Sequence, residues 1–534
     1  MNALWSFIMI WGIWILVPLI VDGGYALVHL VYALIYGRNP KKQKFAEEDL
    51  PVVSVIIPTY NEEKNIDHCL NSLKIQDYPH EKIEIIVIDD GSSDTTKARV
   101  VNHISELNGN GSVNGKKYEN GKSNGNVNGP ENGKGNNKIK VNGKTYDANG
   151  FLGKIRLSTS GHKGKSFALN TGIIEATGEI IVNIDSDVQL APSAIRNMVY
   201  AFVMDKSLGA ATGNIEINLD PFGEHYQNGL SVLDEHGKSK VKNLNFSQSF
   251  LGKCQFLEYL NAFRLGREFQ ARTNSLYTLA GAFSAFRASC LFKTSLYREK
   301  TVSEDTDLTF DLHNQDIKIG YINNAKAYIA PCLSWDTLYA QRVRWSRGEL
   351  EVGGLNKRIL KEEKFDFFRK INLPLTLTFD HTFAFLRLIW VLLLPLFFLF
   401  GYPPRVIFTA MFLMYLFYLV VDFVNTAACY YISDKDTRKQ VEKTLYWCLV
   451  LPAFRFVTFY FRMAGYLIAL TEPAKWQVPG MMSELKNGVN GVKNGVNGVK
   501  NGVNGIKNGL KNGVKNGVVN GLKNGLANFF GLFS

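Results

Sequence analysis

Residues 179–187 read EIIVNIDSD, an apolar run that ends directly in two aspartates separated by one residue. Short apolar runs of this kind are typical of buried parallel strands. Three more runs have the same character: EIIVIDDG (84–91), VVSVIIPTY (52–60) and KIRLSTS (154–160). Two helix-like segments alternate with them: NIDHCLNSLKIQ (65–76) and FALNTGIIEAT (167–177). This alternation predicts an α/β domain with a mostly parallel, Rossmann-like sheet that helices cover on both faces.

The net charge of the 534-residue chain is +12, but it is unevenly placed. Residues 108–150 carry +4 and residues 485–534 carry +7, so together they hold +11 of the +12. The remainder is close to neutral, so a nucleic-acid partner is not expected. None of the six cysteines forms C-x-x-C or has zinc-site spacing to histidine, which favours free thiols in a reducing compartment.

Long apolar stretches flank the predicted α/β domain. Residues 1–37 contain an N-terminal transmembrane helix, with a second short span as the alternative, and residues 376–470 contain three more spans, near 376–400, 406–428 and 445–470. Lys and Arg follow the first span directly and recur in the loop at 433–443. The positive-inside rule then predicts a multi-pass protein of the cell membrane with its catalytic domain in the cytoplasm. We expect residues 351–375 to be an interfacial segment.

Two segments are rich in Asn-Gly pairs. Residues 108–150 are expected to be a disordered insertion between the second and third strands, which divides the α/β domain into residues 38–107 and 151–350. Residues 471–534 form a low-complexity tail that is also rich in lysine. Apolar residues recur in the tail with a 3.5-residue period, but a glycine in each repeat opposes a helix by ~1 kcal/mol. Disorder, or a weak helix on a membrane, is therefore expected.

Acidic residues follow the predicted strands at the edge of the sheet where ligands bind. Asp185 and Asp187 stand at i and i+2, on one face, and can share Mg²⁺ or Mn²⁺ while substrate phosphates complete its shell. Asp89 and Asp90 could accept hydrogen bonds from a nucleoside. The alternative for both pairs is an ordinary turn at a strand end. Lys165, at a helix start, suits a phosphate.

VSEDTDL (302–308) holds three acids in four residues. Mutual repulsion and partial burial would raise the pKa of one of them, which suits a general base. A solvated acidic turn is the alternative interpretation.

QRVRWSRG (341–348) lies about thirty residues before the late apolar stretches. In a helix, Gln341, Arg344 and Trp345 share one face, where the guanidinium can hold a diphosphate and the indole can stack on a sugar. An interfacial belt is the alternative, and Arg342 and Arg347 are interpreted as ordinary interfacial cations.

This set of motifs resembles the membrane-embedded family 2 glycosyltransferases, the processive group of cellulose, hyaluronan, chitin and poly-N-acetylglucosamine synthases. The matching segments occur in the order of that family and cover roughly residues 50–350: PTYNE (58–62), DDGSSD (89–94), GKSFALNTG (164–172), DSD (185–187), AGAFSAFR (280–287), SEDTDL (303–308) and QRVRW (341–345). Both Asn-Gly segments depart from the pattern, and Ser303 replaces the usual Thr or Gly.

The resemblance implies a GT-A fold and an inverting transfer from a nucleotide-diphosphate sugar. It implies that Asp89 and Asp90 hold the nucleoside, that Asp185 and Asp187 position the metal and diphosphate, and that Asp305, beside Glu304, is the base. Gln341, Arg344 and Trp345 would bind the diphosphate and the acceptor end of the glycan.

The expected function is synthesis of a β-linked polysaccharide from UDP-N-acetylglucosamine or a similar donor, with export through the protein's own spans. Expected partners are the nucleotide sugar, the growing glycan, the lipid bilayer and an accessory membrane subunit. Two alternatives are a transferase that adds one sugar to a lipid phosphate and a non-enzymatic membrane scaffold. Ionisable residues in the late apolar runs would line a glycan path or pair between helices: Asp380, Arg387, Asp422, Arg455 and Arg462.

Overall fold

The computed structural model describes residues 18–36, 49–107, 154–219, 244–356, 399 and 401–471, and short strands at 138–141, 144–147, 232–233 and 239–240. The described residues up to 333 and from 342 to 471 belong to one compact unit, and residues 334–341 belong to a second. The fold described below is that of the first unit.

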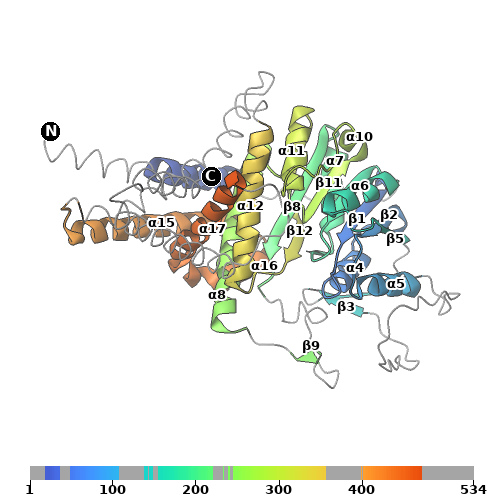
Figure 1. The fold of residues 1–534 in the computed structure, drawn as a ribbon, viewed down its shortest axis with the longest axis horizontal. Coiled ribbons are helices and arrows are strands. Elements are labelled where there is room, and N and C mark those ends of the chain that lie inside the picture. The colour runs from blue at the N-terminus through green and yellow to red at the C-terminus, as the bar shows by residue number, and fades with distance from the viewer. Residues whose placement is uncertain are drawn as a thin grey trace, which may run out of the picture. The chain divides into compact units, whose positions relative to one another are not determined.

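An eight-stranded mixed sheet forms the centre of this unit (Figure 1). Its strands, in spatial order, are β5 (Lys154–Thr159), β2 (Ile83–Asp89), β1 (Val53–Thr59), β6 (Ile180–Ile184), β11 (Phe283–Arg287), β8 (Leu208–Ile217), β12 (Lys318–Ile329) and β7 (Gln189–Leu190). The first four run parallel, as do β8 and β12, whereas β11 is antiparallel to both of its neighbours and β7 is antiparallel to β12. The prediction of a mostly parallel α/β sheet is confirmed.

The four expected strands correspond to β1, β2, β5 and β6, and the two expected helices to α4 (Ile66–Lys74) and α6 (Lys165–Glu175). The sequence analysis did not predict β8, β11 and β12, which extend the sheet beyond β6. Residues 246–267 are helical, in α8 (Phe246–Tyr259) and the π-helix η7 (Leu260–Arg267). The remaining helices of the α/β part are α5 (Thr96–Leu107), α7 (Ala194–Met204), α9 (Glu268–Arg272), α10 (Ala288–Leu291) and α11 (Glu304–Asn314).

Helices α6 and α11 share a hydrophobic core with the sheet. The five central strands each contribute one buried side chain to it: Ile56, Ile181, Phe286, Ala210 and Ile319. Leu169 and Ile173 of α6, and Leu308 and Leu312 of α11, pack against these residues. Both helices therefore begin at fixed positions over the sheet, and their first residues, Lys165 and Glu304, come close to each other.

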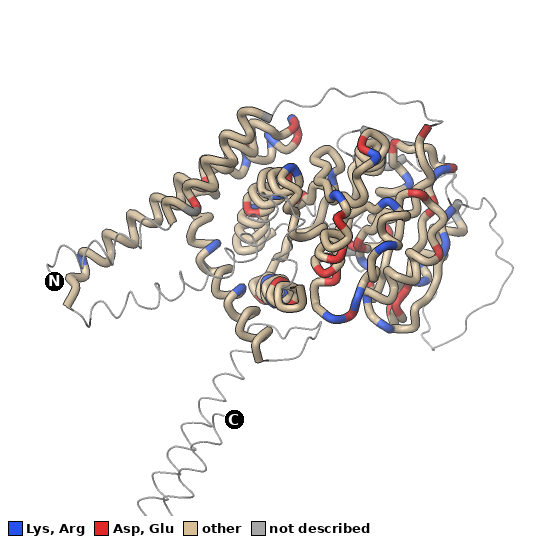
Figure 2. The backbone as a smooth tube through the Cα atoms, turned by 90° about the horizontal axis from the view of Figure 1, so that it is seen from above, with Lys and Arg blue, Asp and Glu red and all other residues tan. Residues whose placement is uncertain are grey.

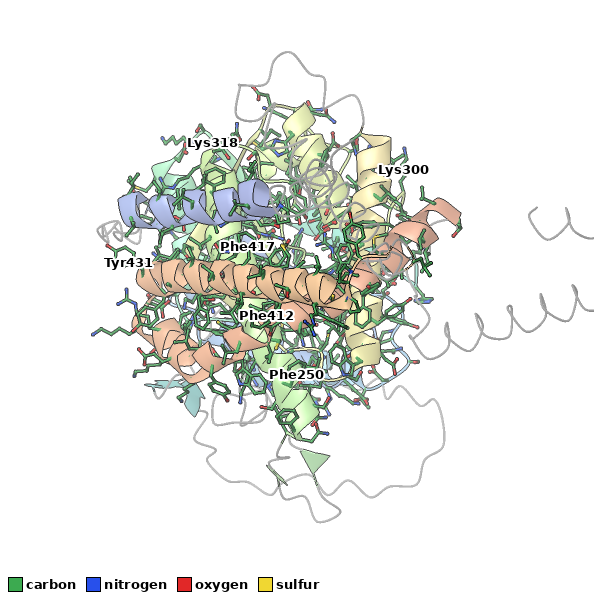
Figure 3. All side chains as sticks on the ribbon, turned by 90° about the vertical axis from the view of Figure 1, so that its left-hand side faces the viewer. Phe250, Lys300, Lys318, Phe412, Phe417 and Tyr431 are labelled. Atoms are coloured by element: carbon green, nitrogen blue, oxygen red, sulfur yellow. The ribbon has the colours of Figure 1, made fainter. Side chains whose placement is uncertain are left out.

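Two helices of the described part of the chain are long and apolar enough to cross a membrane, α15 (Pro404–Ile432) and α17 (Leu451–Thr471). They coincide with the spans expected near 406–428 and 445–470. Helix α3 (Gly24–Tyr36) is apolar but shorter. It lies beside α15 (Figure 3), where the hydroxyl of Tyr418 donates to the Asp22 carboxylate at 2.8 Å. Figure 2 shows how few charged residues α15 carries compared with the sheet.

Several domain expectations fall outside the described residues: the span near 376–400, most of the N-terminal span, most of the interfacial segment and the tail at 472–534. Helix α12 (Trp335–Leu355) continues into the interfacial segment. Within the insertion at 108–150, β3 (Lys138–Val141) and β4 (Lys144–Asp147) form an antiparallel hairpin, so the expected disorder is wrong for these two strands. The expected loop at 433–443 is mostly the helix α16 (Lys435–Thr444), which Asp434 caps through the N–H groups of residues 436 and 437.

Ionic contacts tie this polar connection between α15 and α17 to the sheet. Lys326 Nζ lies 3.0 Å from Glu216 Oε1 and 2.5 Å from Asp434 Oδ2, and Arg264 Nη1 is 3.7 Å from Glu216 Oε1. Burial alone would raise the pKa of Asp434, but Lys326 holds it well below its usual range. The start of α16 is thereby anchored to β8 and β12.

The ionisable residues of the two apolar helices pair with other helices. Asp422 of α15 is fully buried against Arg455 of α17, and Arg462 of α17 lies 3.7 Å from Glu349 of α12. Pairing between helices, one of the two expectations, is what these residues show. Asp380 and Arg387 lie outside the described residues.

Candidate active site

The carboxyl ends of β1 and β6 bring three acids together. Asp185 and Asp187 follow β6 directly, and Glu62 follows β1. Loss of water and the charges of Asp187 and Asp185 raise the pKa of Glu62 to about 7. Burial and the charge of Asp185 raise the pKa of Asp187 to about 6. The residue Asp187 is exposed to solvent. The three acids, here called the acid cluster, are therefore close enough for their charges to repel one another.

Lys165 connects this cluster to the start of α11. Its Nζ lies 2.7 Å from Asp185 Oδ1 and 3.0 Å from Glu304 Oε1. Burial disfavours the charged lysine, but these two carboxylates outweigh burial and raise the pKa of Lys165. Residues that are 119 positions apart in the sequence thus share one ammonium group.

The structure separates the roles of the three acids at 304–307. Glu304 binds Lys165, and the fully buried Asp307 accepts hydrogen bonds from Arg298 at 2.7 and 2.5 Å. Asp305 is only half-buried and accepts from the N–H groups of Gly281 (3.0 Å) and Thr306 (2.7 Å). Burial, followed by the charge of Glu304, raises the pKa of Asp305. Asp305 is the most accessible of the three side chains.

Helix α12 carries the QRVRWSRG motif and places its residues at different sites. The charges of Lys165 and Arg344 oppose the rise in the pKa of Asp187, so Arg344 lies within electrostatic reach of the acid cluster. Trp345 lies beside Tyr259, with ring centroids 6.0 Å apart. Gln341 precedes Arg344 and Trp345 by one helical turn on the same face. The helical spacing expected for the motif is confirmed.

The interpretation of Arg342 and Arg347 as interfacial cations is wrong. Both side chains are buried: Arg342 lies 2.5 Å from Glu258, and Arg347 lies 2.8 Å from Glu351. The guanidinium of Arg342 also stacks 4.5 Å from the Trp345 ring centroid. These two arginines support the helix from inside the fold.

Asp89 and Asp90 are buried and hold the loops at this edge of the sheet. Asp89 accepts from the N–H groups of Gly91 and Ser92 and lies 3.1 Å from Lys97 Nζ. Asp90 binds the loop between β5 and α6, where its oxygens accept from Ser160 Oγ (2.6 Å) and from the N–H groups of Lys163 (2.7 Å) and Gly164 (2.9 Å). The Asp90 contacts fix the start of α6, and thereby the position of Lys165.

Glu62 is the residue of the cluster that the sequence analysis did not single out. It belongs to the PTYNE motif, and its position just after β1 was a usable signal, because β1 and β6 are adjacent parallel strands whose carboxyl ends meet. Its N–H donates to Thr96 Oγ1 at 2.8 Å, which holds it at this edge.

Family models match most of this architecture. Residues 180–461 match the model described as Glycosyl transferase family group 2, and residues 54–134 match Glycosyl transferase family 2. The probable glycosyltransferase YdaM of Bacillus subtilis (strain 168) is 25% identical over 347 residues, which is 65% of this chain and 66% of the relative. Poly-beta-1,6-N-acetyl-D-glucosamine synthase of Staphylococcus aureus (strain COL) is 25% identical over 317 residues, 59% of either chain. The chain thus spans slightly less than two thirds of the length of these relatives.

A solved structure is also similar to this chain. The mannosyltransferase PcManGT from Pyrobaculum calidifontis, in complex with GDP-Man and Mn²⁺, is 16% identical, with 85% of this chain and 96% of that chain covered and a TM-score of 0.49. The family model at residues 180–461 takes in β6, the acids at 185, 187 and 304–307, the α12 motif and both long apolar helices, more than half of the chain. The chain therefore belongs to glycosyl transferase family group 2.

Proposed function

We propose that the protein polymerises N-acetylglucosamine, or a closely similar sugar, from a UDP-linked donor into a β-linked polysaccharide. The observation that carries this proposal is the position of Lys165, which binds Asp185 at the strand end and Glu304 beside Asp305. A donor diphosphate bound at Asp185 would then place its sugar close to Asp305, because Lys165 bridges Asp185 and Glu304. The name of the Staphylococcus aureus relative supports the choice of sugar.

Asp185 and Asp187 would hold Mg²⁺ or Mn²⁺. Two neighbouring carboxylates at a strand end, with a mutual repulsion that raises the pKa of Asp187, fit a divalent cation. In the described part of the chain no three His, Cys, Asp or Glu side chains converge on one point, so substrate oxygens and water would complete the shell. When bound, the ion neutralises charge on the leaving diphosphate.

Asp305 acts on the acceptor. Its carboxylate takes the proton of the acceptor hydroxyl as that oxygen bonds to the anomeric carbon of the donor sugar. The bond from this carbon to the diphosphate breaks on the opposite side, and its electron pair leaves with UDP, which inverts the configuration. The N–H groups of Gly281 and Thr306 hold the carboxylate in place, and the raised pKa of Asp305 strengthens it as a base. Arg344 and Lys165 would balance the charge of the diphosphate.

The remaining motif residues would bind the acceptor glycan and the nucleoside of the donor. Gln341 and Trp345 would hold the acceptor end of the glycan, and the loops held by Asp89 and Asp90 would hold the nucleoside. Helix α17 packs on α12 at Gly465, close to Val343 and Ser346. A polymer that starts at Trp345 would then meet an apolar helix, which supports export through the spans of a multi-pass cell-membrane protein with a cytoplasmic active site.

Membranes that contain the protein test the proposal. With UDP-N-acetylglucosamine and Mg²⁺ or Mn²⁺ they should release UDP and form chains many sugars long. Asp305→Asn should abolish both, whereas Asp316→Asn, an exposed position just past the other end of α11, should not. A short lipid-linked product would support the single-sugar transferase instead. No UDP release from any of a panel of UDP-sugars would refute the proposal.

A further inference from the structure

A side chain of α12 binds the loop just before the proposed base. Val302 lies three residues before Asp305, and its N–H donates to Glu351 Oε2 at 3.1 Å. Val302 is buried and lies outside the helices and strands, where its N–H needs a side-chain partner. Glu351, 49 positions later in the sequence, provides this partner.

Glu351 is itself held in one orientation. Arg347, one turn earlier on α12, donates from Nε to Glu351 Oε1 at 2.8 Å. The two side chains are only 2% and 14% exposed. A buried ion pair contributes little net stability, but it fixes the geometry of both groups. The second oxygen of Glu351 is therefore aimed at Val302.

Gly348 gives a second, independent contact with the same loop. A Cβ at this position would lie 1.9 Å from Ser303 Oγ and 2.6 Å from Ser303 Cβ. Helix α12 and the start of α11 thus approach so closely that only glycine fits. The hydrogen bond to Val302 and this packing against Ser303 together set where α11 begins.

The same helix carries Arg344 and Trp345, so one rigid element presents the acceptor motif and locates the base. We propose that Glu351 is a positioning residue for Asp305: by holding the Val302 N–H, it sets the base at a fixed place relative to the acceptor motif. The inference rests on the proposed function, in which Asp305 is the base.

Two double variants isolate the hydrogen bond. Arg347→Leu/Glu351→Gln and Arg347→Leu/Glu351→Leu both lack the ion pair and leave no unpaired buried charge. They differ in whether an oxygen faces Val302. A misplacement of about 1 Å costs on the order of 100-fold in rate. We expect kcat of the Leu/Leu variant to be about 10- to 100-fold below that of the Leu/Gln variant, with KM for UDP-N-acetylglucosamine within about twofold because the donor site is untouched.

Equal kcat values in the two variants would overturn the inference, and so would a parallel rise in KM, which would indicate general damage. If the Leu/Leu variant is not recovered folded, Gly348→Ala decides: it should lower kcat without changing KM, and a folded Gly348→Ala protein with the wild-type kcat would overturn the inference. Failure of the proposed function is recognised separately, because the wild-type protein would then turn over no UDP-sugar.

Discussion

Replacing Lys165 with methionine tests the link between the strand-end acids and the base. Methionine keeps most of the length and apolar part of the lysine side chain, so the main change is the loss of one positive charge. Asp185 and Glu304 would lose a partner at 2.7 and 3.0 Å. Asp185, Glu304 and Asp305 would then lack the ammonium group that balances their negative charge.

The size of the effect follows from these distances. At an effective dielectric constant near 20, each contact corresponds to about 5–6 kcal/mol of Coulomb attraction. Much of this offsets the cost of removing the ions from water, and loss of one partner of a buried pair costs about 3–5 kcal/mol. Because Lys165 and Asp185 remain 26% and 29% exposed, we take the lower limit. About 3 kcal/mol in the transition state corresponds to a loss of about 100-fold in kcat/KM.

The pH dependence gives the test its direction. The charge of Lys165 lowers the pKa of Asp305, against the larger effects of burial and Glu304 that raise it. Removing Lys165 therefore raises this pKa further, and Asp305 stays protonated, and inactive as a base, up to a higher pH. The acidic limb of the rate profile should move to higher pH in Lys165→Met.

The assay is UDP release against pH, with donor and metal saturating. Lys163→Met is the matched control, because it removes a lysine two positions earlier whose Nζ lies over the Phe167 ring at 4.4 Å. It should leave the acidic limb in place. An unshifted acidic limb in Lys165→Met, or an equal shift in both variants, would refute the electrostatic role of Lys165.

Three further predictions address stability and packing. Arg298→Ala leaves the buried Asp307 carboxylate unpaired and should destabilise the protein by about 3–5 kcal/mol, seen as a lower Tm that Arg298→Leu/Asp307→Asn largely restores. Gly465→Val brings a side chain within 2.5 Å of a carbonyl oxygen of α12 and should cost about 1–3 kcal/mol, measured by thermal unfolding in detergent. Lys318 and Ser207 lower the pKa of Asp205 to about 2, so the stabilisation of the fold by this carboxylate is present above pH 3.8 and is lost as pH falls towards 2. The stabilisation is below about 1 kcal/mol at this exposed site. Urea unfolding of Asp205→Asn should show that this acid-dependent loss of stability is removed.

The strands that could be predicted are those that can be recognised from the residue pattern of the local sequence alone. β1, β2 and β6 are apolar runs that end in polar residues at the sheet edge. β12 alternates buried and exposed residues irregularly and has a break in register between Ile322 and Lys326. β11 is short and is paired on both sides by strands from other parts of the chain. Such strands depend on long-range partners, which local patterns do not report.

The site divides in the same way. Asp185 and Asp187 were predictable because a strand directly precedes them, and Asp305 because its acidic neighbours suggested a raised pKa. The contact of Lys165 with Glu304 was not predictable, because it depends on α6 and α11 packing on one face of the sheet. The hydrogen bond from Val302 to Glu351 likewise depends on the approach of two helices.

The three arginines of α12 show which part of such a motif local geometry can resolve. Successive helical residues are rotated by about 100°, so the side chains of Arg342 and Arg344 leave the helix about 160° apart, on nearly opposite faces. Only one of these two side chains can therefore face the acid cluster, and the ion pair of Arg342 with Glu258 shows that it is not Arg342. Arg347 stands one turn after Arg344, and its side chain is buried in an ion pair with Glu351. Among several cationic side chains of one helix, some can therefore face a substrate site while others pair with acids inside the fold. The positions of the acidic partners decide which cation has which role.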